Sequence, residues 1–222
     1  HDFEEINHIH LFNKKVEWKE EHHSPAGYLK TATMQEVFAE LKEILGNSEN
    51  AHAIYDLLEK AYLKHENLRE ATRFLANELF GQFGLVILDA NDKRLKKLFT
   101  AQLEDDIFYH RNYDWVNATN QQLEEAGYKT QVNPREVNCF YMTESLRERI
   151  VEEDGDYKVL NTDWTFSREE MQKRIAEQPE NFSPNVVLRP LYQEFILPNI
   201  AYLGGAGELS YWLQYREMFA QQ

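Results

Sequence analysis

Apolar and polar positions follow a helical period in the first third of the chain. Three stretches there carry apolar residues three and four positions apart, each between a capping residue and a stop signal such as Gly46 or Gly81. Each stretch has one apolar stripe, which indicates a packing face rather than a cofactor-binding surface. The predicted helices are 34–45, capped by Thr33, then 48–63, opened by Ser48, and 67–80, opened by Asn67.

The helical period returns between residues 93 and 126 and ends at Gly127. A stretch of this length without proline or glycine predicts either one long helix or two helices with a break near His110, and the pattern leaves both open. A capping box formed by Ser167 and Glu170 predicts a further helix over 168–178.

A period of two, or a short apolar run, marks the predicted strands. Residues 9–20 predict a strand or hairpin, and short runs between 130 and 160, with a turn at 153–156, predict a small antiparallel sheet. Three further apolar runs end at polar or glycine residues. They predict buried strands, because their side chains are almost all apolar and bury favourably on both faces of a sheet. These runs are 84–89, 186–188 and 200–203.

The last of these runs leads into the sequence GGAGE at 204–208, after which a helix is expected. Glycines let backbone N–H groups approach a ligand, and the start of a helix favours a phosphate or carboxylate. The same turn also serves as a tight strand-to-helix connection, and both interpretations stay open. Arg189, at the end of its predicted strand, is either a solvated charge or a clamp for a carboxylate or phosphate.

Charge and composition narrow the class of protein. Lys and Arg number 24 against 38 Asp and Glu, a formal net charge of −14, which argues against a general nucleic-acid-binding protein. No apolar run approaches the roughly 20 residues that cross a bilayer, so we expect a cytoplasmic protein without a membrane segment. The single cysteine, Cys139, excludes an intramolecular disulfide, and we interpret it as core packing rather than as a nucleophile.

Several of the first ten residues have side chains of metal-ligand type, and the candidates considered are His1, Asp2, Glu5, His8 and His10. Their spacing is not the helical His-Glu-x-x-His pattern, which places two ligands one turn apart. No further ligand group is recognisable elsewhere in the sequence. No metal is therefore predicted.

Residues 183–212 read SPNVVLRPLYQEFILPNIAYLGGAGELSYW, and residues 84–89 read GLVILD. Both segments resemble the bacterial bacillithiol biosynthesis cysteine-adding enzyme family. The first closely matches its pattern S-P-N-V-x-L-R-P-x-x-Q-D/E-x-x-L-P-x-x-A-Y-x-G-G-x-G-E-x-x-Y-W, and the second matches its G-L-V-x-L-D strand. The opening HDFEEINH, residues 1–8, is similar to the family's E-D-H-D-F-x-E-x-N-H without its first two residues, so we interpret the chain as a fragment. The resemblance implies an α/β fold with a Rossmann-like nucleotidyltransferase core, similar to class I tRNA synthetases, that carries helical and small antiparallel-sheet insertions.

On this resemblance, the chain is organised as five segments. They are a core cleft segment at 1–20, a helical connecting insertion at 21–82, a core strand and long helix at 83–129, a small antiparallel sheet and helix at 130–180, and core strands with the GGAGE turn at 181–222.

The resemblance also implies the site residues. Arg189 would hold a carboxylate or phosphate, and the glycine backbone would approach the activated group. Asn138 either faces substrate or is a buried residue that holds a turn. The implied residues are His1, Asp2 and His8 as catalytic residues, and Asn7, Asn138, Tyr141, Arg189, Gln193, Gly204, Gly205, Gly207, Glu208 and Tyr211 as substrate-binding residues.

The family's reaction, as the resemblance implies, joins the carboxyl group of cysteine to the amine of glucosaminyl malate and completes bacillithiol. This is an amide ligation, and activation of the carboxylate makes ATP the expected cofactor. We expect the fragment to be inactive alone and the family's homodimer to form through a coiled-coil region that lies beyond Gln222. The alternative is a non-catalytic α/β module that binds a small anionic metabolite or nucleotide.

Overall fold

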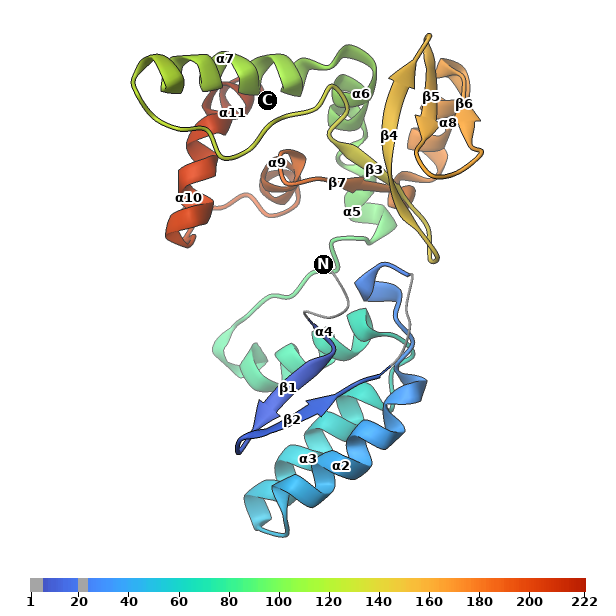
Figure 1. Cartoon of the computed structure of the whole chain (residues 1–222), viewed down its shortest axis with the longest axis vertical. Coiled ribbons are helices and arrows are strands. Elements are labelled where there is room, and N and C mark those ends of the chain that lie inside the picture. The colour runs from blue at the N-terminus through green and yellow to red at the C-terminus, as the bar shows by residue number, and fades with distance from the viewer. Residues whose placement is uncertain (1–5, 20–23) are drawn as a thin grey trace. The chain divides into compact units, whose positions relative to one another are not determined.

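The computed structural model describes residues 6–19 and 24–222. The chain divides into two compact units, which Figure 1 shows with their elements labelled. The first unit contains His1–Asp89 with Glu144–Leu146, and the second contains Ala90–Thr143 with Arg147–Gln222. Each unit is built around its own cluster of buried apolar residues.

The first unit begins with a β-hairpin. Strand β1 (His8–Leu11) pairs antiparallel with β2 (Lys14–Glu17), which confirms the hairpin expected within 9–20. Phe12 and Asn13 form its two-residue turn with φ angles of 46° and 67°. Positive φ at both positions is the geometry of a type I′ turn, whose twist matches that of the flanking strands.

Three helices follow at the places that the apolar period predicts. Ser48 Oγ accepts a hydrogen bond from Ala51 N, and Asn67 Oδ1 accepts one from Glu70 N, so two of the three predicted caps are confirmed. The predicted Thr33 cap is wrong, because Thr33 lies inside a 3-10 turn and accepts a hydrogen bond from Trp18 Nε1 instead. The elements are η1 (Ala26–Tyr28), η2 (Thr31–Met34), α2 (Gln35–Leu45), α3 (Glu49–Tyr62), α4 (Leu68–Phe80) and η3 (Gly81–Phe83).

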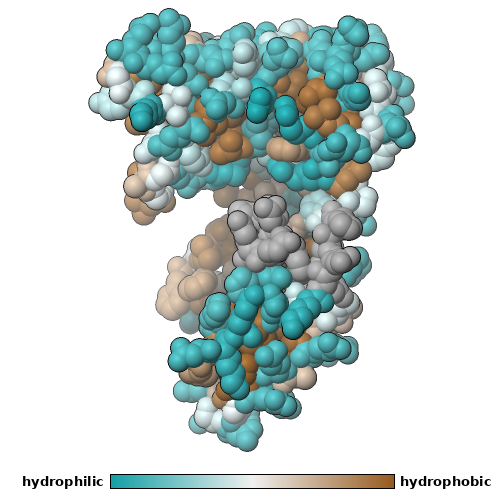
Figure 2. Space-filling model, in the orientation of Figure 1, coloured by the Kyte–Doolittle hydropathy of each residue, from teal (hydrophilic) through white to brown (hydrophobic). Residues whose placement is uncertain are grey.

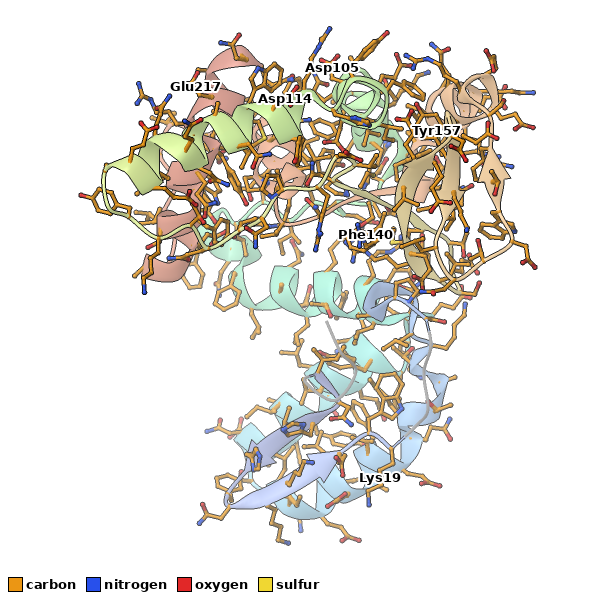
Figure 3. All side chains as sticks on the ribbon, turned by 45° about the horizontal axis from the view of Figure 1, so that its top comes forward. Lys19, Asp105, Asp114, Phe140, Tyr157 and Glu217 are labelled. Atoms are coloured by element: carbon orange, nitrogen blue, oxygen red, sulfur yellow. The ribbon has the colours of Figure 1, made fainter. Side chains whose placement is uncertain are left out.

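The second unit contains the predicted antiparallel sheet, extended to five strands in the order β6-β5-β4-β3-β7. Asp154 and Gly155, with φ angles of 54° and 87°, form the predicted turn between β4 and β5. Figure 3 shows Phe140 on β3 and Tyr157 on β5. The strands are β3 (Cys139–Met142), β4 (Arg147–Glu153), β5 (Asp156–Val159), β6 (Thr165–Phe166) and β7 (Phe182–Pro184).

The helical pattern at 93–126 forms separate helices rather than one. His110 adopts a left-handed conformation with φ of 53°, so the break predicted near this residue is confirmed. A second break, at Leu98 and Phe99, was not predicted. The pieces are α5 (Lys93–Lys97), α6 (Thr100–Tyr109) and α7 (Arg111–Glu125).

The remaining helices lie in the last quarter of the chain. The capping box of Ser167 and Glu170 is confirmed at the start of α8. The elements are α8 (Arg168–Glu177), η4 (Pro179–Asn181), α9 (Leu188–Ile196), α10 (Ala206–Trp212), η5 (Leu213–Tyr215) and α11 (Arg216–Gln221). None of the helices among the described residues is both long and apolar enough to cross a bilayer.

The core of the second unit lies between its sheet and its helices. Phe99, Tyr157, Phe182 and Tyr215 are among its largest fully buried side chains. Cys139 belongs to this core, and burial raises the pKa of its thiol to about 12. Because a thiol with so high a pKa carries almost no thiolate at neutral pH, its predicted role in packing is confirmed.

Two of the predicted buried strands are not strands in the structure. Residues 84–89 and 200–203 lack regular secondary structure, and Val86, Ile200 and Leu203 are largely exposed. An apolar run becomes a strand only when a neighbouring strand pairs with its backbone, and no described segment pairs with either run.

Figure 2 shows separate hydrophobic patches on a mostly hydrophilic face.

The third predicted strand, 186–188, is also wrong, because the chain starts helix α9 there. Asn185 Oδ1 accepts hydrogen bonds from Val187 N at 2.8 Å and Leu188 N at 3.3 Å. These bonds satisfy amides that a helix leaves free at its start. Pro190 then lies in the first turn, where its missing N–H costs nothing. The side-chain cap from Asn185 thus favours a helix start here, although Val186 and Val187 have a high preference for strands.

Candidate functional site

Arg189, in the first turn of α9, contacts three other predicted substrate-binding residues. Its Nη1 donates to Gln193 Oε1 at 3.3 Å. Its Nη2 donates to Glu208 Oε1 and to Tyr211 Oη, the latter at 3.1 Å. Tyr211 Oη in turn lies 3.2 Å from Glu208 Oε1. We call these four residues the arginine cluster.

Helical spacing accounts for half of this arrangement. Arg189 and Gln193 are four residues apart on α9, and Glu208 and Tyr211 are three apart on α10, so each pair lies on one helix face. The segment between the two helices has no regular structure. The packing of α9 and α10 therefore decides that the two pairs meet.

The arginine cluster is charged and accessible to solvent. The Arg189 side chain is 43% exposed and that of Glu208 is 27% exposed. The pKa of the Glu208 carboxyl lies below its ordinary value. The main cause is a hydrogen bond from Tyr202; desolvation acts in the opposite direction, and Arg189 lowers the pKa further. The cluster therefore presents an ion pair at neutral pH, and a ligand carboxylate or ammonium group can share it.

The three glycines near the cluster differ in what the fold requires of them. A Cβ atom on Gly204 would lie 2.8 Å from Tyr202 Cε1, and the Tyr202 ring is itself stacked on Trp212 with ring centroids 4.0 Å apart. A Cβ atom on Gly205 or Gly207 would meet nothing within 4 Å. The local fold thus excludes a side chain at Gly204 only, and the backbone at the other two positions borders open space.

Asn138 does not belong to the arginine cluster. Its side chain is fully buried, and its Oδ1 accepts from Arg135 N at 2.9 Å and from Asn185 Nδ2 at 3.1 Å. Its Nδ2 donates to Arg135 O at 2.6 Å and to Asp106 Oδ1 at 3.1 Å. Since an asparagine amide has two donor and two acceptor positions, nothing remains for a substrate. The structure supports the turn-holding alternative.

Asp106, which sequence reasoning missed, is the centre of this network. It is fully buried, its Oδ2 accepts from Asn138 N at 2.6 Å, and its Oδ1 also accepts from Asn112 Nδ2 at 3.2 Å. Burial raises the pKa of its carboxyl to about 7 in spite of these hydrogen bonds. The available signal was its position on the apolar face of α6, between Leu103 and Ile107.

Asn185, also missed, connects this network to the arginine cluster. Its backbone N donates to Asn138 O at 3.0 Å, and its side chain caps α9. Its backbone O accepts from Arg189 N at 2.9 Å. We call Asp106, Asn138 and Asn185 the asparagine network. It holds the end of α9 from which Arg189 projects.

Tyr141 lies in the core of the second unit. Its side chain is 3% exposed, and its hydroxyl accepts hydrogen bonds from Arg174 Nη1 at 3.0 Å and Asn181 Nδ2 at 3.3 Å. Its ring contacts that of Phe182 edge-on, with centroids 5.6 Å apart. The structure therefore places this predicted substrate contact among packing residues.

Asn7 and His8 lie in the first unit, whereas the arginine cluster lies in the second. His8 Nδ1 is 3.0 Å from Asn7 Oδ1. Both line a pocket of about 300 Å³ whose other walls are apolar side chains of the hairpin and of α2, α3 and α4. The predicted catalytic residues His1 and Asp2 lie outside the described residues, as does Glu5.

Comparison with known proteins identifies the family. The family model described as "Bacillithiol biosynthesis BshC, N-terminal Rossmann-like domain" matches residues 1–222. The chain belongs to this family. The family resemblance noted in the sequence is confirmed, and so is the Rossmann-like α/β fold class.

Similar proteins carry the printed name "Putative cysteine ligase BshC". Identity is 45% to the protein of Christiangramia forsetii, 47% to that of Flavobacterium johnsoniae and 48% to that of Flavobacterium psychrophilum. Each alignment covers 99% of this chain and 41% of the relative. The chain thus spans about two fifths of the length of these relatives.

Proposed function

We propose that this chain is part of a ligase that joins the carboxyl group of cysteine to the amine of glucosaminyl malate through an amide bond. Membership of the bacillithiol biosynthesis family and the name of the relatives support a cysteine ligase. The observation that carries the proposal for this chain is the arginine cluster, which presents a cation and an anion side by side.

Free cysteine is a zwitterion, and the arginine cluster matches its charges. The planar guanidinium of Arg189 suits a carboxylate, because it offers several N–H donors in one fork. The carboxylate of Glu208 suits the ammonium group. Gln193 and Tyr211 already hydrogen-bond Arg189 and keep its guanidinium oriented. Orientation of this kind lowers the entropy cost of bringing two reactants together.

A carboxylate does not react with an amine until one of its oxygens becomes a leaving group. ATP is the proposed source of that activation, and when bound it supplies the phosphoryl or adenylyl group that activates the oxygen. Arg189 and the open backbone at Gly205 and Gly207 fit an anionic group of this kind. No metal is included in the proposal.

The attacking amine must lose a proton during the reaction. We assign this role to His8, whose ring Asn7 orients through the 3.0 Å contact, with His1 and Asp2 as the other proposed participants. Histidine suits the role because its ordinary pKa lies near neutral pH.

The test is a ligation assay on the full-length protein with cysteine and glucosaminyl malate, with and without ATP, read by mass spectrometry. Arg189→Ala and His8→Ala are each expected to lower the rate by roughly a hundredfold or more, since each removes a group that acts on the reacting atoms. Arg94→Ala is the matched control, because the Arg94 side chain is 88% exposed and forms an ion pair with the neighbouring Asp92. It is expected to keep full activity.

Absence of product with folded wild-type protein that still binds ligand would favour the non-catalytic binding module instead. The chain of residues 1–222 by itself is expected to give no product, because it spans 41% of its relatives. Product from this piece would contradict that expectation. A homodimer formed through a region beyond Gln222 and a cytoplasmic location stay predictions.

A further inference from the structure

The second unit contains another pocket, none of whose lining residues belongs to the arginine cluster. Its volume is about 310 Å³, and its walls are Tyr113 of α7, residues 134–137 of the loop before β3, and residues 149–152 of β4. A volume of this size holds a small metabolite. We call it the Arg149 pocket.

Two arginines line the Arg149 pocket, Arg135 on the exposed loop before β3 and Arg149 half-buried on β4. Within residues 6–19 and 24–222, neither Arg135 nor Arg149 makes a side-chain hydrogen bond or ion pair. Other arginines of the same unit do have partners, such as Arg111 with Asp105 and Arg174 with Tyr141. Neither guanidinium is taken up by a carboxylate of this acidic chain, so both are available to an anionic ligand.

The two carboxylates of the pocket do not cancel this charge. Glu152 Oε2 lies 3.1 Å from His110 Nε2, so this carboxylate group is directed toward the histidine ring. Glu136 is exposed on the loop. Because solvent screens its charge, it opposes an anion in the pocket less than a buried carboxylate would.

Both arginines project from backbone that is already held in place. The Arg135 N and O atoms both hydrogen-bond the buried amide of Asn138, at 2.9 Å and 2.6 Å. Arg149 lies opposite Phe140 in the β3–β4 pairing, and its O accepts from Leu160 N at 2.9 Å. Little backbone order has to be gained when a ligand binds, which favours affinity.

We propose that the Arg149 pocket binds a small dicarboxylate, with Arg135 and Arg149 each holding a carboxylate group. The half-buried hydroxyl of Tyr113, which makes no hydrogen bond to the described part of the chain, is placed to donate a third bond. This site is separate from the arginine cluster and does not depend on the proposed ligase activity.

The test is isothermal titration calorimetry of the full-length protein with succinate as the probe. Wild-type protein is expected to bind succinate in the millimolar range or tighter, and Arg149→Ala and Arg135→Ala are each expected to weaken binding roughly tenfold, since each removes a charge-assisted hydrogen bond. Arg149→Lys is the control that keeps the positive charge. Its affinity for succinate is expected to lie between those of wild type and Arg149→Ala. Thermal melting of each variant establishes that it is folded.

Arg189→Ala is the control that separates this proposal from the proposed function. It is expected to leave succinate binding unchanged while lowering the ligation rate by roughly a hundredfold or more. Competition by glucosaminyl malate would identify its malate group as the dicarboxylate, and its absence would indicate a free metabolite. The proposal is overturned if wild-type protein shows no succinate binding, if Arg149→Ala binds as well as wild type, or if inorganic phosphate binds with equal affinity.

Discussion

The arginine cluster and the asparagine network lie at the same end of α9, yet they use polar side chains in opposite ways. Asp106 and Asn138 are fully buried, and every donor and acceptor of the Asn138 amide is used within the protein. Arg189 and Glu208 are 43% and 27% exposed and share their charges with solvent. Both groups contain residues that the family motif marks as substrate contacts.

The comparison shows that residue type does not separate a binding group from a structural one. A buried polar group destabilises the fold unless its hydrogen bonds are complete. A network in which every donor and acceptor is used therefore cannot bind a ligand, and removal of one member leaves its partners unsatisfied and lowers the free energy of unfolding. A partly exposed ion pair adds little to the free energy of unfolding, because water solvates and screens both charges. The two regions are therefore expected to respond differently to mutation.

The largest expected difference is in stability. Asn138→Ala should lower the free energy of unfolding by roughly 3 kcal/mol, because it removes one of the hydrogen bonds to the buried Asp106 carboxylate and both hydrogen bonds that the side chain makes to the Arg135 backbone. Arg189→Ala should change it by less than about 1 kcal/mol. Urea denaturation of both variants measures this, and equal losses would show that the cluster is as structural as the network.

The second expected effect is a pH dependence that arises from Asp106. In the folded protein its pKa is raised from 3.8 to about 7, so between these values the folded state holds a proton that the unfolded state has released. The contribution of Asp106 to stability therefore falls as pH rises from about 4 to 7, by roughly 4 kcal/mol at most.

Asp106→Asn removes this titration and isolates it from the other carboxyls of the chain. The stability of wild type relative to this variant should fall between pH 5 and pH 8 by roughly 2.5 kcal/mol. Urea denaturation at both pH values measures the difference. Parallel pH profiles for the two proteins would mean that Asp106 is ionised throughout this range in the folded state.

A third, smaller difference should separate the glycines beside the cluster. Gly204→Ala is expected to cost about 1 to 2 kcal/mol, because the added methyl group collides with Tyr202. Gly205→Ala and Gly207→Ala should cost less than about 0.5 kcal/mol and yet lower ligation activity, because the methyl groups occupy space near the proposed substrate. Full ligation activity in both variants would show that the backbone at Gly205 and Gly207 is not part of the substrate site.

The smallest expected effect concerns Tyr141. Tyr141→Phe removes the acceptor for Arg174 and Asn181 and should lower the free energy of unfolding by about 1 kcal/mol. Ligation activity should stay at the wild-type level. A large loss of activity without a loss of stability would return Tyr141 to the substrate contacts.

Local signals in the sequence account for most of the secondary structure. Ser48, Asn67 and the capping box at Ser167 predict helix starts correctly, and the β4–β5 turn is correct as well. These elements form from bonds between residues a few positions apart, so neighbours in sequence suffice to specify them. The members of the arginine cluster were also named from the sequence, through the family motif.

Tertiary structure alone decided which polar residues are buried and which apolar runs become strands. Asp106 and Asn138 are 32 residues apart, and Asn185 joins them from 47 residues further along the chain. Residues 84–89 and 200–203 have the composition of strands and remain unpaired among the described residues. Burial and strand pairing depend on groups that are distant in sequence, and the pattern of a segment does not contain its partner.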